Sequence, residues 1–178
     1  PISSMGSHVS MSPNHQVFRS TSLHTRANVA YFGTFGYELD LNCLTKEEIS
    51  EVKEQIAFMK QYREILQFGN FYRLKSPFEG NETAWMAVSE DRRTAIVGWY
   101  RVLNTVNGCY TRLRLEGLEP GFCYRDSQSG SLCYGDELMN LGLCTSDSTA
   151  GEVTEGKVPC TDFESRIYVL EAENLPGI

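Results

Sequence analysis

The chain has 178 residues, of which 41% are hydrophobic and 22% charged, with 16 Lys and Arg against 23 Asp and Glu. These proportions are typical of a folded globular protein and exclude global disorder. The longest unbroken apolar run, residues 95–100, is six residues long, whereas roughly 20 are needed to span a bilayer. After residue 75, 16 acidic residues oppose eight basic ones, and no basic stripe offsets them, so nucleic acid is excluded as a partner.

The first 44 residues contain little periodic pattern. Residues 1–20 are rich in Ser, Pro, Asn and His, which indicates a loop or the exit of a strand. Ser22 is placed to cap a short helix that begins at Leu23 and stops at Gly33. Residues 37–41 alternate between apolar and polar, but five residues alone do not distinguish a strand from a loop.

The clearest predicted element is a helix from Thr45 to Phe68. Thr45 and Glu48 have the spacing of a capping box, and Gly69 follows as a helix stop. Apolar residues recur every three or four positions along one stripe, at Ile49, Val52, Ile56, Met59, Tyr62 and Leu66. A stripe of this length needs a partner surface, so we expect it to pack on the chain's own β domain or to mediate self-association.

Beyond the Ser76–Asn81 turn the period changes from helical to strand-like. The expected strands are residues 83–89, 94–104, 110–115, 121–125, 131–134 and 165–173. These strands predict an antiparallel β domain, which we expect to be a sandwich. The elements expected in the first 75 residues, by contrast, cannot form a closed core by themselves. We therefore interpret these residues as the end of a larger fold.

Six cysteines are present, but none forms a C-x-x-C pair, so a zinc knuckle is not supported. We expect six free thiols in a reducing compartment, since no basic segment followed by an apolar one opens the chain. Cys123 and Cys133 flank an expected hairpin turn and are the pair most expected to approach each other.

No catalytic constellation emerges from the residues alone. His8, His15 and His24 lack acidic or cysteine partners nearby, and the neighbouring serines lack a G-x-S-x-G elbow. Asp136 and Glu137 are adjacent carboxylates, but neighbours on an extended chain point to opposite faces and cannot flank one bond. Seven aromatic residues, most of them on expected strands, could form a sugar-stacking platform, although core packing accounts for them better: Phe78, Trp85, Trp99, Tyr100, Phe122, Tyr124 and Tyr134.

Several blocks resemble a known enzyme family. They include SMGSHVS within Pro1–Gln16, FGYELDL within Thr25–Leu41, and SPFEGNETAW within Ser76–Ser89, together with Gln55–Leu74 and Gly135–Leu143. The sequence is similar to the bacterial α-galactosidases of glycoside hydrolase family 36 over nearly all of its length. The segment Met5–His8 could be mistaken for the remnant of an expression tag, but it lies inside one of these blocks and is therefore interpreted as native sequence.

The resemblance implies an α+β fragment of a longer enzyme. Residues 1–75 would be the C-terminal end of a (β/α)₈ catalytic barrel, with the exit of its eighth strand and the closing helices, and residues 76–178 would be a C-terminal antiparallel β-sandwich domain. The family hydrolyses α-galactosides with retention, using one Asp as nucleophile and another as acid/base. Both motifs lie outside this sequence, so no catalytic residue can be assigned and the chain alone is expected to be inactive.

The resemblance also implies where individual residues lie in the barrel. Active sites of such barrels lie at the C-terminal ends of the strands, so Ser4, Gly6 and His8 are expected to line or support the rim of the galactose pocket. The resemblance implies a cytoplasmic enzyme acting on melibiose- or raffinose-type oligosaccharides, with homo-oligomer contacts and no cofactor, metal, membrane or nucleic acid. Two roles stay open for this chain: a scaffold that closes and supports the barrel, or an independent carbohydrate-binding β module.

Overall fold

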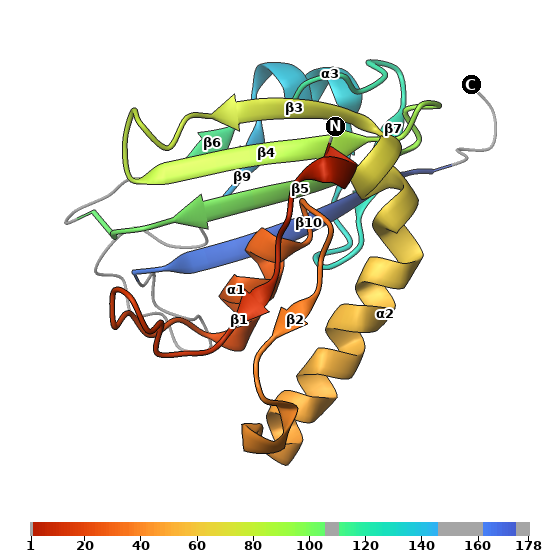
Figure 1. Cartoon of the computed structure of the whole chain (residues 1–178). Coiled ribbons are helices and arrows are strands. Elements are labelled where there is room, and N and C mark those ends of the chain that lie inside the picture. Colours follow the sequence, from red (N-terminus) through yellow and green to blue (C-terminus); the bar gives the residue numbers. More distant parts are fainter. Residues whose placement is uncertain (1, 106–110, 146–161, 174–178) are drawn as a thin grey trace. The chain divides into compact units, whose positions relative to one another are not determined.

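The computed structural model describes residues 2–105, 111–145 and 162–173. The chain divides into two compact units, Pro1–Gly69 and Asn70–Ile178, and each is described by itself (Figure 1). Residues 70–75 lie in the second unit, six residues ahead of the boundary expected from the sequence. No helix in the described ranges is both long enough and apolar enough to cross a membrane.

The first unit contains two short parallel strands joined by a helical crossover. Its elements are η1 (Ile2–Ser4), β1 (Val9–Ser10), α1 (Leu23–Ala30), β2 (Tyr37–Glu38), η2 (Leu41–Cys43) and α2 (Lys46–Phe68). β1 and β2 pair in parallel, with Val9 opposite Tyr37 and Ser10 opposite Glu38. Parallel neighbours require a crossover connection, and α1 supplies it, so β1–α1–β2 is a βαβ unit. The sequence indicated one strand exit in this region, whereas the structure contains two paired strands.

α1 begins where the sequence predicted. The Ser22 side chain accepts a hydrogen bond from the Thr25 N–H at 3.0 Å, which caps the helix. Leu23, Ala27 and Ala30 follow at helical spacing and are buried.

α2 confirms the predicted long helix and its capping box. Thr45 Oγ1 accepts from the Glu48 N–H at 3.2 Å, and Glu48 Oε2 accepts from the Thr45 N–H at 2.9 Å. The helix ends at Gly69. The φ of this glycine is −67°, so it does not adopt the left-handed conformation that glycine often has at the end of a helix.

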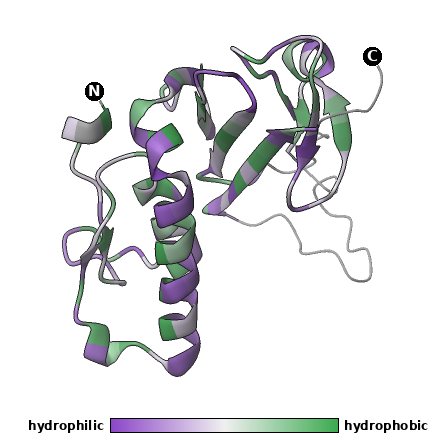
Figure 2. Ribbon diagram, turned by 90° about the vertical axis from the view of Figure 1, so that its right-hand side faces the viewer, coloured by the Kyte–Doolittle hydropathy of each residue, from purple (hydrophilic) through white to green (hydrophobic). Residues whose placement is uncertain are grey.

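The apolar stripe of α2 finds part of its partner within the first unit. Val52, Met59 and Leu66 are buried, whereas Ile49 near the helix start is exposed. The Phe58 ring lies 4.6 Å from the Tyr31 ring, measured between centroids. Figure 2 shows hydrophilic and hydrophobic residues interleaved along α2, as expected of a helix with one buried face.

The second unit is built on a six-stranded sheet with the order β3-β4-β5-β10-β7-β8, in which every pairing is antiparallel. The strands are β3 (Asn70–Lys75), β4 (Glu82–Val88), β5 (Thr94–Arg101), β7 (Cys123–Asp126), β8 (Leu132–Tyr134) and β10 (Glu164–Ala172). A separate two-stranded ladder joins β6 (Arg112–Leu113) to β9 (Leu143–Cys144), and α3 spans Gly135–Asn140. In Figure 1, β3, β4, β5 and β10 run side by side across this unit.

One face of the sheet forms the core of the second unit. Alternate residues of β4 and β5, such as Met86, Val97 and Trp99, pack with Leu113 beside the β6–β9 ladder and with Leu138 of α3. Trp99 is fully buried under the guanidinium of Arg101, which lies 4.7 Å from the ring. The second layer over this face, among the described residues, is a short ladder and a helix, and the expected sandwich is not confirmed.

One local expectation was wrong, because Asp136 and Glu137 lie in the first turn of α3 and not on an extended chain. Cys123 and Cys133 do approach each other on the paired strands β7 and β8: burial raises the pKa of Cys133, and the nearby Cys123 is a smaller cause. Their register partners are Tyr134 and Tyr124 respectively, so the two side chains point to opposite faces of the sheet. The cysteines in the described ranges are not joined in disulfides: Cys43, Cys123, Cys133 and Cys144.

Candidate functional site

The candidate site of the first unit is built on the parallel contact between residues 5–10 and residues 33–38. The Val9 N–H donates to the Gly36 carbonyl at 2.8 Å, and the Thr34 N–H donates to the Met5 carbonyl at 3.0 Å. Both hydrogen bonds fit the register that places Val9 opposite Tyr37. The parallel pairing therefore extends beyond the two residues assigned to each strand.

Gly33 allows this close approach. A Cβ atom at residue 33 would lie 2.4 Å from the Ser7 Cβ and 2.9 Å from the Met5 carbonyl oxygen. Gly36, three residues later, has open space at the same position. A side chain at residue 33 would therefore push the two segments apart, whereas one at residue 36 would not.

The two faces of this ladder differ. Val9 is fully buried, and its register partner Tyr37 donates its hydroxyl to Gln55 Oε1 of α2 at 2.8 Å, so both belong to the face that the helices cover. Side chains alternate along a strand, so residues 6 and 8 share the other face, whereas Ser4 lies in the 3-10 helix η1, to which this alternation does not apply. The sequence-predicted rim residues Ser4, Gly6 and His8 are all exposed.

On that open face His8 meets Glu38. His8 Nε2 lies 2.7 Å from Glu38 Oε2, and the side chains are 51% and 74% exposed. An ion pair this exposed contributes little to stability. Sequence reasoning did not join these two residues, because their pairing depends on the parallel register of β1 and β2.

Behind the ladder, a polar chain runs into α2. Gln55, buried in the apolar stripe, accepts from Tyr37 and donates its Nε2 to Glu51 Oε1 at 2.8 Å. Burial, with the negative charge of Glu51 as a smaller cause, raises the pKa of Tyr37 to about 12. Burial also raises the pKa of Tyr31 far above its usual value. Both phenols are therefore neutral at physiological pH.

The other candidates from the sequence do not assemble. His24 is hydrogen-bonded to Asn28 at 3.0 Å, His15 is exposed, and the described residues contain no cluster of three metal-ligating side chains. Asp136 and Glu137 follow each other in a helical turn, about 100° apart around its axis, and cannot flank one bond. Their geometry therefore differs from the extended one that was expected.

The aromatic residues do not form a platform either. Trp99, Tyr100 and Tyr124 are buried, as core packing predicts. Phe78 is 96% exposed in the turn after β3, and Tyr134 is 43% exposed on β8.

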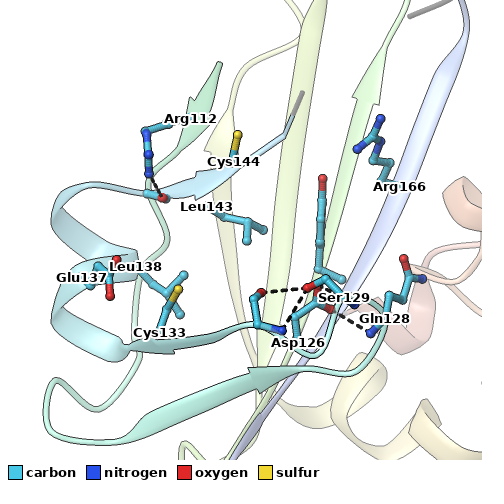
Figure 3. A pocket seen from close by; sticks show the side chains of 13 residues that line it. Arg112, Asp126, Gln128, Ser129, Cys133, Glu137, Leu138, Leu143, Cys144 and Arg166 are labelled. Atoms are coloured by element: carbon cyan, nitrogen blue, oxygen red, sulfur yellow. Dashed lines mark hydrogen bonds between the residues drawn. The ribbon is translucent and has the colours of Figure 1, made fainter. Parts of the chain in front are cut away.

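A cavity of about 580 Å³ lies within the second unit, on the core face of the sheet where β7, β8 and β10 meet α3 and the β6–β9 ladder (Figure 3). Leu138, Leu143 and Tyr168 contribute apolar surface, and Arg112, Glu137, Gln128 and Arg166 contribute polar groups. Sequence reasoning missed this cavity, because its residues come from five separate segments.

The walls of the cavity are held by hydrogen bonds. Asp126, only 5% exposed, accepts from the Gln128 N–H at 3.2 Å and from the Ser129 N–H and hydroxyl at 3.3 and 2.5 Å, which fixes the β7–β8 turn. On the other side, Arg112 donates to the Gly142 carbonyl at 3.1 Å. These bonds are drawn in Figure 3.

Comparison with known proteins gives two family matches that together cover most of the chain. Residues 1–69 match the Melibiase model, and residues 82–170 match the model of the glycosyl hydrolase family 36 C-terminal domain. The chain thus carries the C-terminal region of a glycosidase.

It belongs to glycoside hydrolase family 36. It is 53% identical to the α-galactosidase AgaA of Geobacillus stearothermophilus over 143 residues, which are 80% of this chain and 20% of that enzyme. It matches a crystal structure of an AgaA variant in complex with raffinose with a TM-score of 0.87 and 46% identity, over 97% of this chain and 22% of that one. An α-galactosidase structure from Lactobacillus brevis gives a TM-score of 0.90 and 42% identity, over all of this chain and 24% of that one. The chain therefore spans about a fifth of the length of the relatives it matches.

Proposed function

We propose that this chain is the C-terminal part of a retaining α-galactosidase that hydrolyses terminal α-galactosyl residues of melibiose- and raffinose-type oligosaccharides. The chain carries neither catalytic aspartate of the family and is inactive alone. Its role is to close and support the catalytic barrel, in a cytoplasmic enzyme that assembles as a homo-oligomer. The alternative role, a carbohydrate-binding module, is considered for the second unit below.

The observation that carries this proposal is the β1–α1–β2 unit, in which two parallel strands are joined by a helix and, within the described part of the first unit, the face of Val9 and Tyr37 is the one that packs on the helices. In a (β/α)₈ barrel the helices lie outside and the opposite strand face lines the interior. We assign β1 and β2 as the last two barrel strands, which replaces the single strand exit expected from the sequence. His8 and Glu38 then point into the barrel.

The same assignment predicts how far each proposed rim residue lies from the substrate pocket. Active sites lie at the C-terminal ends of barrel strands, which here are the ends at Ser10 and Glu38. At about 3.3 Å per residue, Gly6 lies roughly 13 Å before Ser10, and Ser4 lies further back still. His8, held by Glu38, is thus the member of the three nearest the substrate pocket, and Ser4 and Gly6 support it from deeper in the barrel.

The experiment compares the chain alone with a chimera in which it replaces the matching C-terminal segment of Geobacillus stearothermophilus AgaA. The chain alone should hydrolyse an aryl α-galactoside no faster than buffer, because a retaining glycosidase needs two carboxyl groups about 5–5.5 Å apart. The chimera should hydrolyse it and release the α-anomer first, seen by NMR. AgaA truncated before this segment is the matched control and should be inactive.

Two results would contradict the proposal. One is turnover by the purified chain that disappears in Asp136→Asn or Glu137→Gln, which would make α3 the catalytic site. The other is a chimera that folds, judged by size-exclusion chromatography and circular dichroism, but has no activity.

A further inference from the structure

The cavity of the second unit has the two kinds of surface that a small polar ligand needs. Leu138, Leu143 and the ring of Tyr168 form apolar surface, while Arg112, Glu137, Gln128 and Arg166 bring donors and acceptors. Its volume of about 580 Å³ falls within the roughly 300–1,000 Å³ of known ligand pockets. In Figure 3 Arg112 and Glu137 lie on one side of the cavity and Arg166 on the other, with Leu143 between the two arginines.

The charges of the lining select the ligand class. The lining carries two arginines, Arg112 and Arg166, and two carboxylates, Asp126 and Glu137, and Arg166 is already paired with Glu164 outside the lining. An anion would meet the two carboxylates, and a cation would meet the two guanidinium groups, each at an electrostatic cost. A neutral ligand with many hydroxyl groups meets neither cost, because a hydroxyl donates to a carboxylate and accepts from a guanidinium.

The polar groups are also set in place before a ligand arrives. Arg112 is fixed by the Gly142 carbonyl through one of its five donors. Arg166 is fixed by Glu164, whose Oε1 accepts from its Nε at 3.0 Å and from its terminal nitrogen at 2.8 Å. Asp126 fixes the turn that carries Gln128. Side chains that are already ordered lose less entropy on binding.

We propose that this cavity binds one hexose unit of a neutral oligosaccharide, at a site made entirely by the second unit. The C–H face of the sugar packs on Leu138, Leu143 and Tyr168, and its hydroxyls bond to Arg112, Glu137 and Gln128. The choice of an α-galactosyl oligosaccharide as the ligand rests on the proposed function, whereas the existence of the site does not. The site would bind part of the substrate of the enzyme without taking part in the reaction.

The test is an NMR titration of the ¹⁵N-labelled 178-residue chain with raffinose. We expect saturable millimolar binding, worth about 4 kcal/mol, with amide shifts at residues 128–133, 138 and 143. Inorganic phosphate, the anionic probe, should cause no saturable shifts there. Ser131→Trp fills the cavity from an exposed lining position and should weaken raffinose binding at least about tenfold, whereas Ser127→Trp, exposed in the same turn but outside the lining, should not.

A second pair of variants tests the charge argument. Arg112→Met should weaken binding at least about tenfold, and Arg114→Met, an exposed arginine outside the lining, should leave it unchanged. Absence of raffinose shifts, binding of phosphate in place of raffinose, shifts only at residues 4–8, or equal affinity in Ser131→Trp and Ser127→Trp would each overturn the site. Because the readout is binding and not hydrolysis, an inactive chimera with an intact raffinose titration would count against the proposed function alone.

Discussion

Gly33 shows how one missing methyl group permits the parallel ladder of the first unit. Its position leaves 2.4 Å between a hypothetical Cβ and the Ser7 Cβ, closer than any packed pair can come. Gly33→Ala should therefore destabilise the first unit by about 1–3 kcal/mol, the usual cost of overpacking. Gly36→Ala, where the added methyl group meets open space, is the control and should change stability by less than about 1 kcal/mol. Urea denaturation followed by circular dichroism measures both, and equal effects of the two would contradict the close approach.

Tyr37 gives the first unit a predictable response to alkaline pH. Its pKa is raised to about 12 by burial and by Glu51, from an ordinary value of about 10. Above pH 10 the unfolded chain therefore loses this proton first, so the free energy of unfolding falls as pH rises from 10 toward 12. Tyr37→Phe should remove part of that fall and, through loss of the hydrogen bond to Gln55, cost about 0.5–1.5 kcal/mol at pH 7. Denaturation curves at pH 7 and pH 11 check both effects, with Tyr134→Phe, an exposed tyrosine of the second unit, as control. An unchanged alkaline slope in Tyr37→Phe would contradict the assignment.

Among the elements, α2 depends on its first turn. The capping box satisfies two backbone N–H groups that have no partner inside the helix. Thr45→Ala should lower the free energy of unfolding by about 1 kcal/mol. Ser50→Ala, an exposed change in the same helix, should have no such cost. Thermal melts of the two variants make the comparison, and a Thr45→Ala melt that coincides with the unsubstituted chain would show that the box is not formed in solution.

The elements also show which parts of the fold the sequence could predict. The helix from Lys46 and the strands at Glu82, Thr94 and Glu164 were predicted within one or two residues at their starts, because each has a long apolar period and turn residues at its ends. β3 was missed because its apolar residues are half-exposed, and β9 because two residues carry no period. α3 was misread as extended because its six residues are too few to display helical periodicity.

The candidate sites were less predictable than the elements. Ser4, Gly6 and His8 could be singled out only through family resemblance, and strand alternation places only Gly6 and His8 on a common face, because Ser4 lies in the 3-10 helix η1. The pairing of His8 with Glu38 requires the parallel register, which depends on contacts between residues 30 positions apart. The cavity requires the packing of α3 and β9 onto the sheet, and neither element was predicted.

At the scale of the whole molecule, the cysteines give a count that can be measured. The sequence has six, and the four in the described ranges form no disulfide, with the side chains of Cys123 and Cys133 on opposite faces of the sheet. Burial raises the pKa of Cys133, which slows its reaction as a thiolate in the folded protein. The denatured, unreduced chain should therefore react with six equivalents of a thiol reagent, and prior reduction should not raise that number. Four equivalents before reduction and six after would reveal a disulfide.

The strand order of the second unit sets the moment at which this part of the chain can fold during its synthesis. β10 lies between β5 and β7, so it joins two ribbons, β3–β4–β5 and β7–β8, that share no direct strand pairing. Until residues 164–172 have left the ribosome, each ribbon has an open edge on the side that β10 will occupy, and open strand edges are sites of aggregation. Pairing across this distance in the sequence is also slow to form. A nascent chain stalled before residue 164 would therefore expose the apolar residues of β5, including Ile96 and Val97, to chaperones and proteases, and translation of β10 is the step that commits the second unit to its native sheet.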